Sequence, residues 1–191
     1  MPSTHTPPRA TRKRLIEIIK ALSVETGRVF KLASGRESDF YCNLKPTMLD
    51  PEGAYLLGAL IGEALAGDAP DLVGGLEIGA VPLATATAAV GHAAGHPLRA
   101  FFVRKQAKGH GTQSLVEGLR RGETLAGKRI VVLEDVTTTG GSSLKAIDAI
   151  KAEGGIVVKV LTVVDRQEGA AAAFEAAGMP FAALVTAAEL R

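Results

Sequence analysis

The stretch of residues 130–143 constrains the fold of this 191-residue chain more than any other. Four apolar residues lead directly into two adjacent acids, Glu134 and Asp135. Threonines, glycines and serines follow, and then an amphipathic stretch begins. An apolar run bounded by turn residues indicates a buried strand, and the later periodicity indicates a helix. The stretch therefore predicts a strand, a polar loop and a helix, with the two acids at the end of the strand.

The loop between this strand and helix has the groups that a phosphate needs. Glycines let the backbone come close, hydroxyls donate hydrogen bonds, and the next helix offers free N–H groups at its positive end. Glu134 and Asp135 cannot attract a phosphate, so they need sugar hydroxyls, a metal or a proton as a partner. A ligand that is both a polyol and a polyphosphate satisfies all of these groups. The alternative is an ordinary strand-to-helix turn, which leaves the paired acids unexplained.

After about residue 50, the expected strands alternate with expected helices. Further strands are expected at residues 72–75, 98–103, 156–164 and 181–185. Helices are expected at residues 10–25 (ended by Gly27), from Asp50 and Pro51 to Gly67, from the end of a loop at Pro82 to about Val90, at residues 168–177, and in a capped turn at residues 186–189. This alternation predicts an α/β fold with a mainly parallel central sheet flanked by helices. Ligands of such sheets bind at the carboxyl ends of the strands.

The first 45 residues do not follow the alternation. Two short strands around the Ser-Gly-Arg turn of residues 34–36 fit this part of the chain. We therefore expect a single domain over residues 1–191. It would consist of a small N-terminal cap, or hood, of about residues 1–45 and a core of about residues 46–191.

Composition excludes several classes of function. The formal net charge is only +2, which predicts no general affinity for nucleic acid or for a membrane surface. Cys42 is the single cysteine, so no internal disulfide can form, as is typical of a reducing compartment. The chain has no apolar signal core and no apolar run long enough for a membrane span. We expect a soluble, cytoplasmic protein, and we assign no metal-ligand role to His92 or His96.

A second group of polar residues precedes the central stretch. Residues 104–110 contain three cations and a histidine: Arg104, Lys105, Lys108 and His110. Long polar loops in compact domains are often lids, and a cationic lid would bind pyrophosphate while it excludes water from the reacting sugar. The alternative is a solvated basic loop, which is what most runs of charge are.

Three segments carry a resemblance to a known family. Residues 130–143 resemble the phosphoribosyl pyrophosphate (PRPP) signature of type I phosphoribosyltransferases. Residues 101–111, Phe-Phe-Val-Arg-Lys-x-x-Lys-x-His-Gly, resemble the flexible catalytic loop of orotate phosphoribosyltransferases. Residues 32–36 and 164–168 resemble that family's Leu-Lys-Ser-Gly-Arg turn and its Asp-Arg-Gln-Glu segment. The likeness covers nearly the whole chain after residue 10.

This resemblance implies a fold, a reaction and an assembly. The fold would be the type I phosphoribosyltransferase core with a hood. The reaction would convert orotate and PRPP into orotidine 5′-monophosphate and pyrophosphate, with magnesium, in pyrimidine biosynthesis. The family works as a homodimer in which the lid of one subunit closes the site of the other. Magnesium (Mg2+) would be held mainly through PRPP, with no direct protein ligand.

The resemblance also assigns roles to individual residues. Glu134 and Asp135 would hold the ribose hydroxyls and take part in catalysis together with Lys108. The loop around the 5′-phosphate would consist of Val136, Thr137, Thr138, Thr139, Gly140, Gly141 and Ser142. Pyrophosphate would be bound by Arg104, Lys105, Lys108 and His110. Orotate would contact Thr138, Arg166, Tyr41 and Cys42.

The chain departs from the family pattern at two expected cations. Ala33 stands where many members carry Lys, and Ile78-Gly79 stands where many carry Tyr-Lys. Lys45 or Arg36 is a candidate replacement for one of them. Cys42 also replaces one of two paired aromatics.

Two other functions remain open at the level of sequence. A purine-type phosphoribosyltransferase would share the central stretch but not the lid pattern or Arg166. A non-catalytic regulator that binds RNA or a nucleotide would not need the acids or Lys108.

Overall fold

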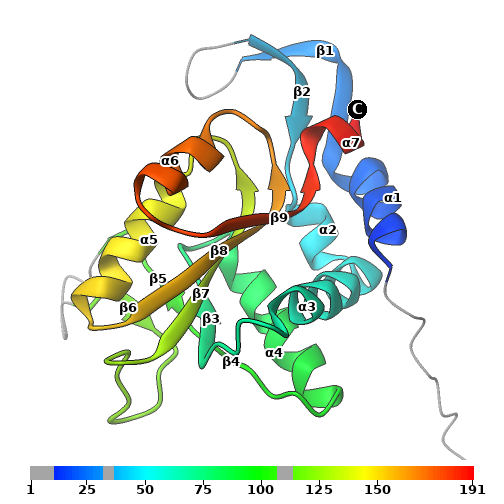
Figure 1. Ribbon diagram of the computed structural model, residues 1–191. Coiled ribbons are helices and arrows are strands. Elements are labelled where there is room, and N and C mark those ends of the chain that lie inside the picture. The colour runs from blue at the N-terminus through cyan, green and yellow to red at the C-terminus, as the bar shows by residue number, and fades with distance from the viewer. Residues whose placement is uncertain (1–10, 32–36, 107–113) are drawn as a thin grey trace, which may run out of the picture.

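The computed structural model describes residues 11–31, 37–106 and 114–191. Its helices are α1 (Arg12–Ser23), α2 (Lys45–Leu49), α3 (Pro51–Leu65), α4 (Ala80–Ala93), α5 (Gly141–Ala152), α6 (Ala170–Ala176) and α7 (Ala187–Leu190). Its strands are β1 (Val24–Lys31), β2 (Glu37–Cys42), β3 (Leu72–Gly74), β4 (Arg99–Ala100), β5 (Phe102–Val103), β6 (Val116–Glu117), β7 (Arg129–Thr137), β8 (Ile156–Asp165) and β9 (Phe181–Thr186). Figure 1 shows helices on both sides of a central sheet.

The central sheet has the strand order β4-β3-β7-β8-β9, and every pair in it is parallel. The strand with the two acids, β7, is the middle strand, with Val131 opposite Val73 of β3 and Lys159 of β8. The predicted parallel α/β sheet is therefore confirmed. Because all five strands point the same way, their carboxyl ends share one edge of the sheet.

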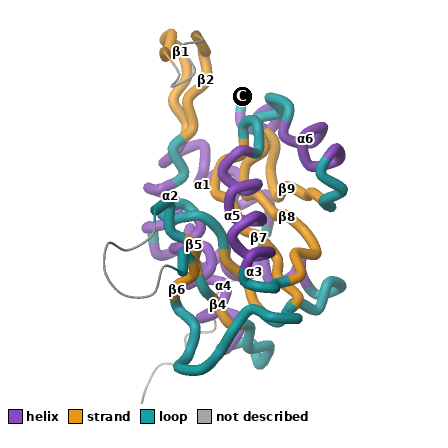
Figure 2. The backbone as a smooth tube through the Cα atoms, turned by 90° about the vertical axis from the view of Figure 1, so that its left-hand side faces the viewer, coloured by secondary structure: helices purple, strands orange, loops and turns teal. Residues whose placement is uncertain are grey.

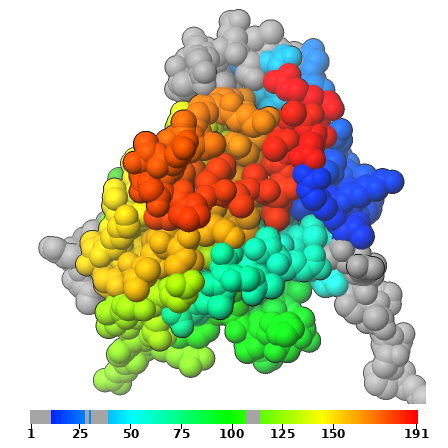
Figure 3. All heavy atoms as spheres, viewed as in Figure 1, coloured from blue at the N-terminus to red at the C-terminus, as the bar shows by residue number. Residues whose placement is uncertain are grey.

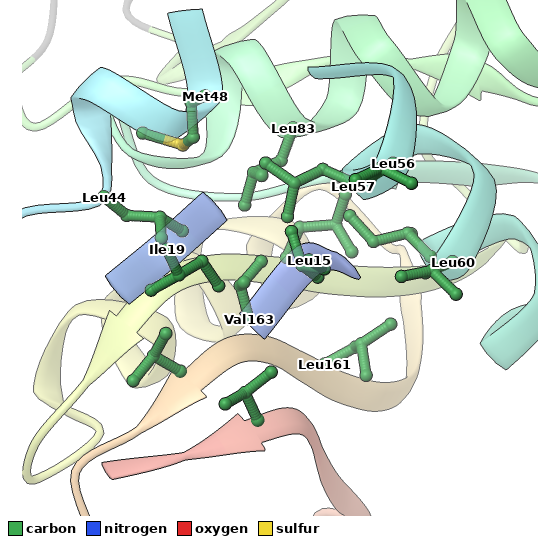
Figure 4. Close-up of a cluster of buried hydrophobic side chains, with 14 of the residues drawn as sticks. Leu15, Ile19, Leu44, Met48, Leu56, Leu57, Leu60, Leu83, Leu161 and Val163 are labelled. Carbon is green, nitrogen blue, oxygen red and sulfur yellow. The ribbon is translucent and has the colours of Figure 1, made fainter. Parts of the chain in front are cut away.

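Alternate residues of β7 pack on opposite faces of the sheet. Val131 and Leu133 belong to the core cluster that contains residues of α1, α3 and α4. Ile130 and Val132 belong to the cluster that contains residues of α5 and α6. All four side chains are completely buried, as expected for a strand covered on both faces. Figure 4 shows the first of these clusters, in which side chains of α1, α3 and β8 meet.

The N-terminal part contains one helix and one hairpin. The predicted helix of residues 10–25 is α1, which ends at Ser23. The expectation that Gly27 ends this helix is wrong. Gly27 lies within β1, at φ +86°, where the pairing with β2 shifts register. The antiparallel hairpin β1–β2 stands out from the rest of the molecule (Figure 2). The turn at residues 34–36 lies outside the described residues.

The helix α1 packs against the core rather than over the hairpin. Leu15 and Ile19 are fully buried among residues of α3 and the sheet. Arg12 donates a hydrogen bond to the carbonyl oxygen of Leu184 and forms an ion pair with Glu189. Figure 3 shows the N-terminal helix directly beside the C-terminal residues. The division into a cap of residues 1–45 and a core of residues 46–191 stays a prediction.

The expected strand at residues 98–103 is split in two. Its first half, β4, pairs with β3 in the central sheet, while β5 pairs with β6 and also contacts the loop after β3 through Val103. The sequence does not predict β6, because a two-residue strand has no periodicity to detect. Among the helices of the described residues, none is long and apolar enough to cross a bilayer.

Candidate active site at the carboxyl ends of the strands

The polar residues predicted for the site lie where β3, β7 and β8 end. The loop of residues 75–79 follows β3, the loop of residues 138–140 connects β7 to α5, and Arg166 comes directly after β8. The carboxyl ends of β8 and β9 point to the side of the hairpin β1–β2 (Figure 1). A pocket for a small ligand is expected at this edge of a parallel sheet.

Glu134 is a buried carboxylic acid near the end of β7. Its side chain is nearly buried, and it accepts a hydrogen bond of 2.8 Å from the hydroxyl of Ser143, in the first turn of α5. Burial raises the pKa of Glu134 to about 7; the Ser143 hydrogen bond opposes this rise, and the neighbouring charge of Asp135 adds to it. Glu134 therefore exchanges a proton near neutral pH.

Asp135 is the more open of the two acids. Its Oδ1 accepts a hydrogen bond of 2.9 Å from the backbone N–H of Val136. Its carboxylate lies against Gly79 of the loop after β3, where a β-carbon built on the glycine would be only 2.5 Å from Oδ1. The acid pair of β7 and the loop after β3 thus form one wall of the site.

The loop from β7 to α5 has the shape of a phosphate cradle. Gly140 takes φ +84°, and a β-carbon there would be 2.9 Å from the ring of Phe174 in α6. The helix α5 then begins at Gly141, and the first-turn residues Gly141 and Ser142 are exposed, as is Thr139. Exposed N–H groups at the start of a helix of this length favour an anion.

Thr137 is placed differently from the other residues of the loop. Its side chain is buried, and its hydroxyl donates a 2.9 Å hydrogen bond to the hydroxyl of Thr162 in β8. Its carbonyl oxygen accepts from the N–H of Arg166. The side chain of Thr137 therefore stabilises the contact between β7 and β8 and is turned away from the loop. Thr138 is half-buried, and its carbonyl oxygen accepts from the N–H of Ala170.

Arg104 and Lys105 lie directly after β5, beside a groove of about 620 Å³ that also reaches Ser142 and Lys145 of α5. The guanidinium of Arg104 forms a 3.6 Å ion pair with Glu117 of β6. The backbone N–H of Lys105 donates a 2.9 Å hydrogen bond to the carboxylate of Glu77. Two of the four predicted pyrophosphate ligands are thus beside the phosphate cradle. Lys108 and His110 lie outside the described residues.

Arg166 is held firmly against the hairpin. Its side chain is only 9% exposed and forms a 2.8 Å ion pair with Glu168. It donates a 3.4 Å hydrogen bond to the carbonyl oxygen of Phe40, and its guanidinium carbon is 5.7 Å from the centre of the Phe40 ring. Arg191 covers the same ring at 5.2 Å. Arg166 is therefore a fixed cation beneath the hairpin, suited to a carboxylate.

Tyr41 and Cys42 complete this side of the site. Tyr41 is partly exposed and stacks on Phe30, with ring centres 5.3 Å apart. Burial raises the pKa of the Cys42 thiol to about 11; Arg166 opposes this rise and Asp135 adds to it. Cys42 is therefore a neutral thiol near both charged groups.

Sequence reasoning missed one residue that shapes the site and one contact between two others. Ser143 is fully buried and holds Glu134, whereas the loop residues predicted for the 5′-phosphate end at Ser142. Its position in the first turn of the helix that follows β7 places it near the end of that strand, but its hydrogen bond to Glu134 appears only in the structure. Glu77 contacts Lys105 across 28 positions of sequence, and no local pattern indicates that contact.

Comparisons with known proteins agree with this geometry. Residues 51–174 match the family described as phosphoribosyl transferase domain. The orotate phosphoribosyltransferase of Bradyrhizobium diazoefficiens is 59% identical over 180 residues, which cover 94% of this chain and 96% of that protein. The crystal structure of Mycobacterium tuberculosis orotate phosphoribosyltransferase with Fe(III) dicitrate has a TM-score of 0.81 at 44% identity and covers 94% of this chain and 98% of that one.

The same Mycobacterium tuberculosis enzyme has been solved in complex with PRPP. That structure has a TM-score of 0.78 at 40% identity, with 94% of this chain and 98% of that chain covered. The predicted type I phosphoribosyltransferase fold is therefore confirmed. High identity along nearly the full length of both chains, together with the paired acids over a phosphate cradle, shows that this chain belongs to the orotate phosphoribosyltransferase family.

Proposed function

We propose that this protein transfers the phosphoribosyl group of PRPP to orotate, which yields orotidine 5′-monophosphate and pyrophosphate in pyrimidine biosynthesis. The observation that carries the proposal is the position of Glu134 and Asp135 beside the glycine-rich start of α5. This pairing suits a ligand with sugar hydroxyls at one end and a phosphate next to them. Family membership supplies the substrates.

The two acids would take different parts in the reaction. As pyrophosphate departs, positive charge develops on the ribose, and a carboxylate fixed beside the sugar stabilises it. Asp135, the more open acid, would carry this negative charge. Glu134, with its pKa raised to about 7 by burial, would hold a ribose hydroxyl by accepting its hydrogen bond.

The loop of residues 136–142 would hold the 5′-phosphate. Its backbone N–H groups and the exposed Ser142 would donate to the phosphate oxygens, while the buried hydroxyl of Thr137 fixes the loop on β8. This would fix the sugar by its 5′ end and so set the position of C1, the carbon at which orotate replaces pyrophosphate. Thr138, which is half-buried at the start of the loop, would contact orotate, as the family resemblance implies.

The cations at the start of the β5–β6 connection would hold the leaving pyrophosphate. Arg104 and Lys105 border the groove beside α5, and Lys108 and His110 follow in the same segment. Magnesium would arrive bound to the diphosphate of PRPP and neutralise part of its charge. Among the described residues, no three acidic, histidine or cysteine side chains gather into a metal site. The oxygen-rich diphosphate is a donor set that Mg2+ prefers.

Orotate would bind between the hairpin and the end of β8. Arg166, held rigidly by Glu168, suits its carboxylate, and the ring would lie near Tyr41 and Cys42. Cys42 stands in place of a second aromatic residue, but its backbone would still be able to contact orotate. The fixed position of Arg166 favours orotate over a purine, which has no carboxylate.

We further propose a homodimer in which residues 104–110 of one subunit close over the site of the other. Family membership and the exposed apolar side chains of Leu49 and Ile78, which are 75% and 63% exposed, support an assembly. We place the reaction in the cytoplasm, which the single free cysteine, Cys42, supports.

The decisive experiment measures the loss of orotate absorbance when PRPP and magnesium are added. Adenine, guanine, xanthine and uracil are tested in parallel. Consumption of a purine but not of orotate would show a purine-type enzyme instead. Absence of turnover with every base, together with RNA or nucleotide binding, would show a non-catalytic regulator. Lys108→Ala is expected to abolish turnover, whereas a binding protein has none to lose.

A further inference from the structure

Glu77 fastens the loop after β3 to the segment after β5. Its backbone N–H donates a 2.7 Å hydrogen bond to the carbonyl oxygen of Val103, and Leu76 forms a parallel bridge with the same residue. The side chain continues this pairing, because Glu77 Oε1 accepts a 2.9 Å hydrogen bond from the N–H of Lys105. The carboxylate of Glu77 thus accepts the hydrogen bond that a backbone carbonyl oxygen would accept if the strand pairing continued.

The segment after β5 is held on its other side as well. The N–H of Arg104 donates a 2.8 Å hydrogen bond to the carbonyl oxygen of Leu115, which continues the pairing of β5 with β6. The guanidinium of Arg104 reaches Glu117 at 3.6 Å. Two hydrogen bonds therefore hold the backbone at Arg104 and Lys105. The bond to Glu77 is the one that connects this backbone to the loop after β3.

The same loop contacts the acid pair two residues later. Gly79 lies against the carboxylate of Asp135, with no space for a β-carbon between them. Residues 77–79 therefore contact the N–H of Lys105 at one end and the carboxylate of Asp135 at the other. They join the cations proposed for pyrophosphate to the carboxylate proposed for the ribose.

We propose that Glu77 is a positioning residue for the diphosphate of PRPP. It sets the distance between the cations at residues 104 and 105 and the acid at residue 135, although it does not itself need to touch the substrate. This inference rests on the proposed function. A carboxylate is suited to the task because its hydrogen bond to a backbone N–H is charge-assisted and stronger than that of a neutral acceptor. The groove that begins at the neighbouring Leu76 is lined by Arg104, Lys105 and Lys145, together with Asp148.

The test compares Glu77→Ala, Glu77→Gln and the matched surface control Glu63→Ala, whose side chain is exposed on α3. Calorimetry measures the affinity for PRPP with magnesium, and steady-state kinetics measures KM for PRPP and for orotate separately. Glu77→Ala should weaken PRPP binding on the order of tenfold, the effect of losing one charge-assisted hydrogen bond, while KM for orotate changes by less than about twofold. Glu77→Gln keeps an oxygen acceptor and should recover most of the PRPP affinity. Glu63→Ala should match the wild type.

Several outcomes would overturn the inference. Unchanged PRPP affinity in Glu77→Ala would exclude a positioning role. Equal losses for PRPP and orotate with a lowered Tm would show a purely structural role, as would the failure of Glu77→Gln to recover affinity. If Glu77→Ala does not fold, Glu77→Asp takes its place, because the aspartate side chain is too short to reach the N–H of Lys105. This variant should bind PRPP more weakly with little change in KM for orotate. Equal losses for both substrates would contradict the inference. Wild-type protein that binds PRPP but does not consume orotate would refute the proposed function and leave the calorimetric test of Glu77 valid.

Discussion

Gly79 and the carboxylate of Asp135 are in direct contact: a β-carbon on Gly79 would be 2.5 Å from Oδ1 and 2.6 Å from the carboxyl carbon. Real β-carbons do not approach other atoms this closely. From the sequence alone, Gly79 stands only for the loss of a cation that many family members carry. The structure gives the glycine a positive reason, because a side chain at residue 79 would displace an acid of the site.

Gly79→Ala should therefore impair the site without unfolding the protein. The methyl group must push the Asp135 carboxylate away from the sugar, and a displacement of about 1 Å can lower kcat/KM on the order of a hundredfold. Steady-state kinetics and Tm are the measurements. The control is Gly62→Ala in α3, where a β-carbon has no neighbour within 4 Å. It should keep full activity and gain roughly 0.5–1 kcal/mol of stability. Equal activity of the two variants would contradict the prediction.

Some of this architecture was predictable because local signals were strong. The long apolar runs of β7 and β8 and the alternation with helices indicated the parallel sheet. Asp50 before Pro51 indicated the start of α3, and the Asp50 side chain does accept from the N–H of Gly53 at 2.9 Å. The capped turn predicted at residues 186–189 is the capping box of α7.

Other features were not predictable because they depend on contacts between distant residues. The strands β5 and β6 have two residues each, so their pairing leaves no pattern in the sequence. Thr137 is among the residues predicted for the phosphate loop, and the sequence does not indicate that its hydroxyl donates a hydrogen bond to Thr162 of the neighbouring strand. The roles of Glu77 and Ser143 likewise appear only when the strand ends are brought together.

The raised pKa of Glu134 makes stability depend on pH. The folded chain keeps this proton up to about pH 7, whereas the unfolded value is 4.5. Between these values the folded state binds more protons than the unfolded state, so the free energy of unfolding falls as pH rises. Glu134→Gln removes this loss and should be more stable than the wild type at about pH 8, by on the order of 2 kcal/mol. Below about pH 4.5 the difference should vanish.

Urea unfolding of both proteins across this pH range measures the difference. Glu63→Gln, an exposed acid of α3, is the matched control and should show no such pH-dependent gain. A constant difference between Glu134→Gln and the wild type at every pH would contradict the raised pKa.

Ser143→Ala should shift the pH dependence of activity. The hydroxyl of Ser143 stabilises the charged form of Glu134, so its removal raises the pKa of Glu134 further. The acidic limb of kcat/KM for PRPP should therefore move to higher pH. Kinetics at a series of pH values, with Glu134→Gln as a variant that lacks this titration, measures the shift. A limb that stays in place in Ser143→Ala would show that Glu134 does not control it.

Gly140→Ala should destabilise the phosphate loop for two reasons. The left-handed backbone of Gly140 costs a side chain about 1 kcal/mol, and the added methyl group would press on the ring of Phe174. Gly95→Ala has the same backbone conformation, φ +79°, but no neighbour within 4 Å, and it should show the backbone cost alone.

A double-mutant cycle with Phe174→Leu separates the two contributions. The smaller side chain makes room for the methyl group, so Gly140→Ala should cost less in that background, by on the order of 1 kcal/mol. Chemical denaturation of the four proteins measures the coupling. Strict additivity would show that the ring does not restrain the loop.

The central position of β7 also has a consequence for how the chain assembles. Leu72 of β3 pairs with Ile130, so β3 emerges from the ribosome long before its main neighbour, and a nascent chain at that stage has only the short β4 to join it. Bringing such distant segments together requires the closure of a large loop, which slows folding. The strand that joins β3 is also the strand that delivers both acids. A growing polypeptide therefore cannot hold the sugar before β7 has paired with β3.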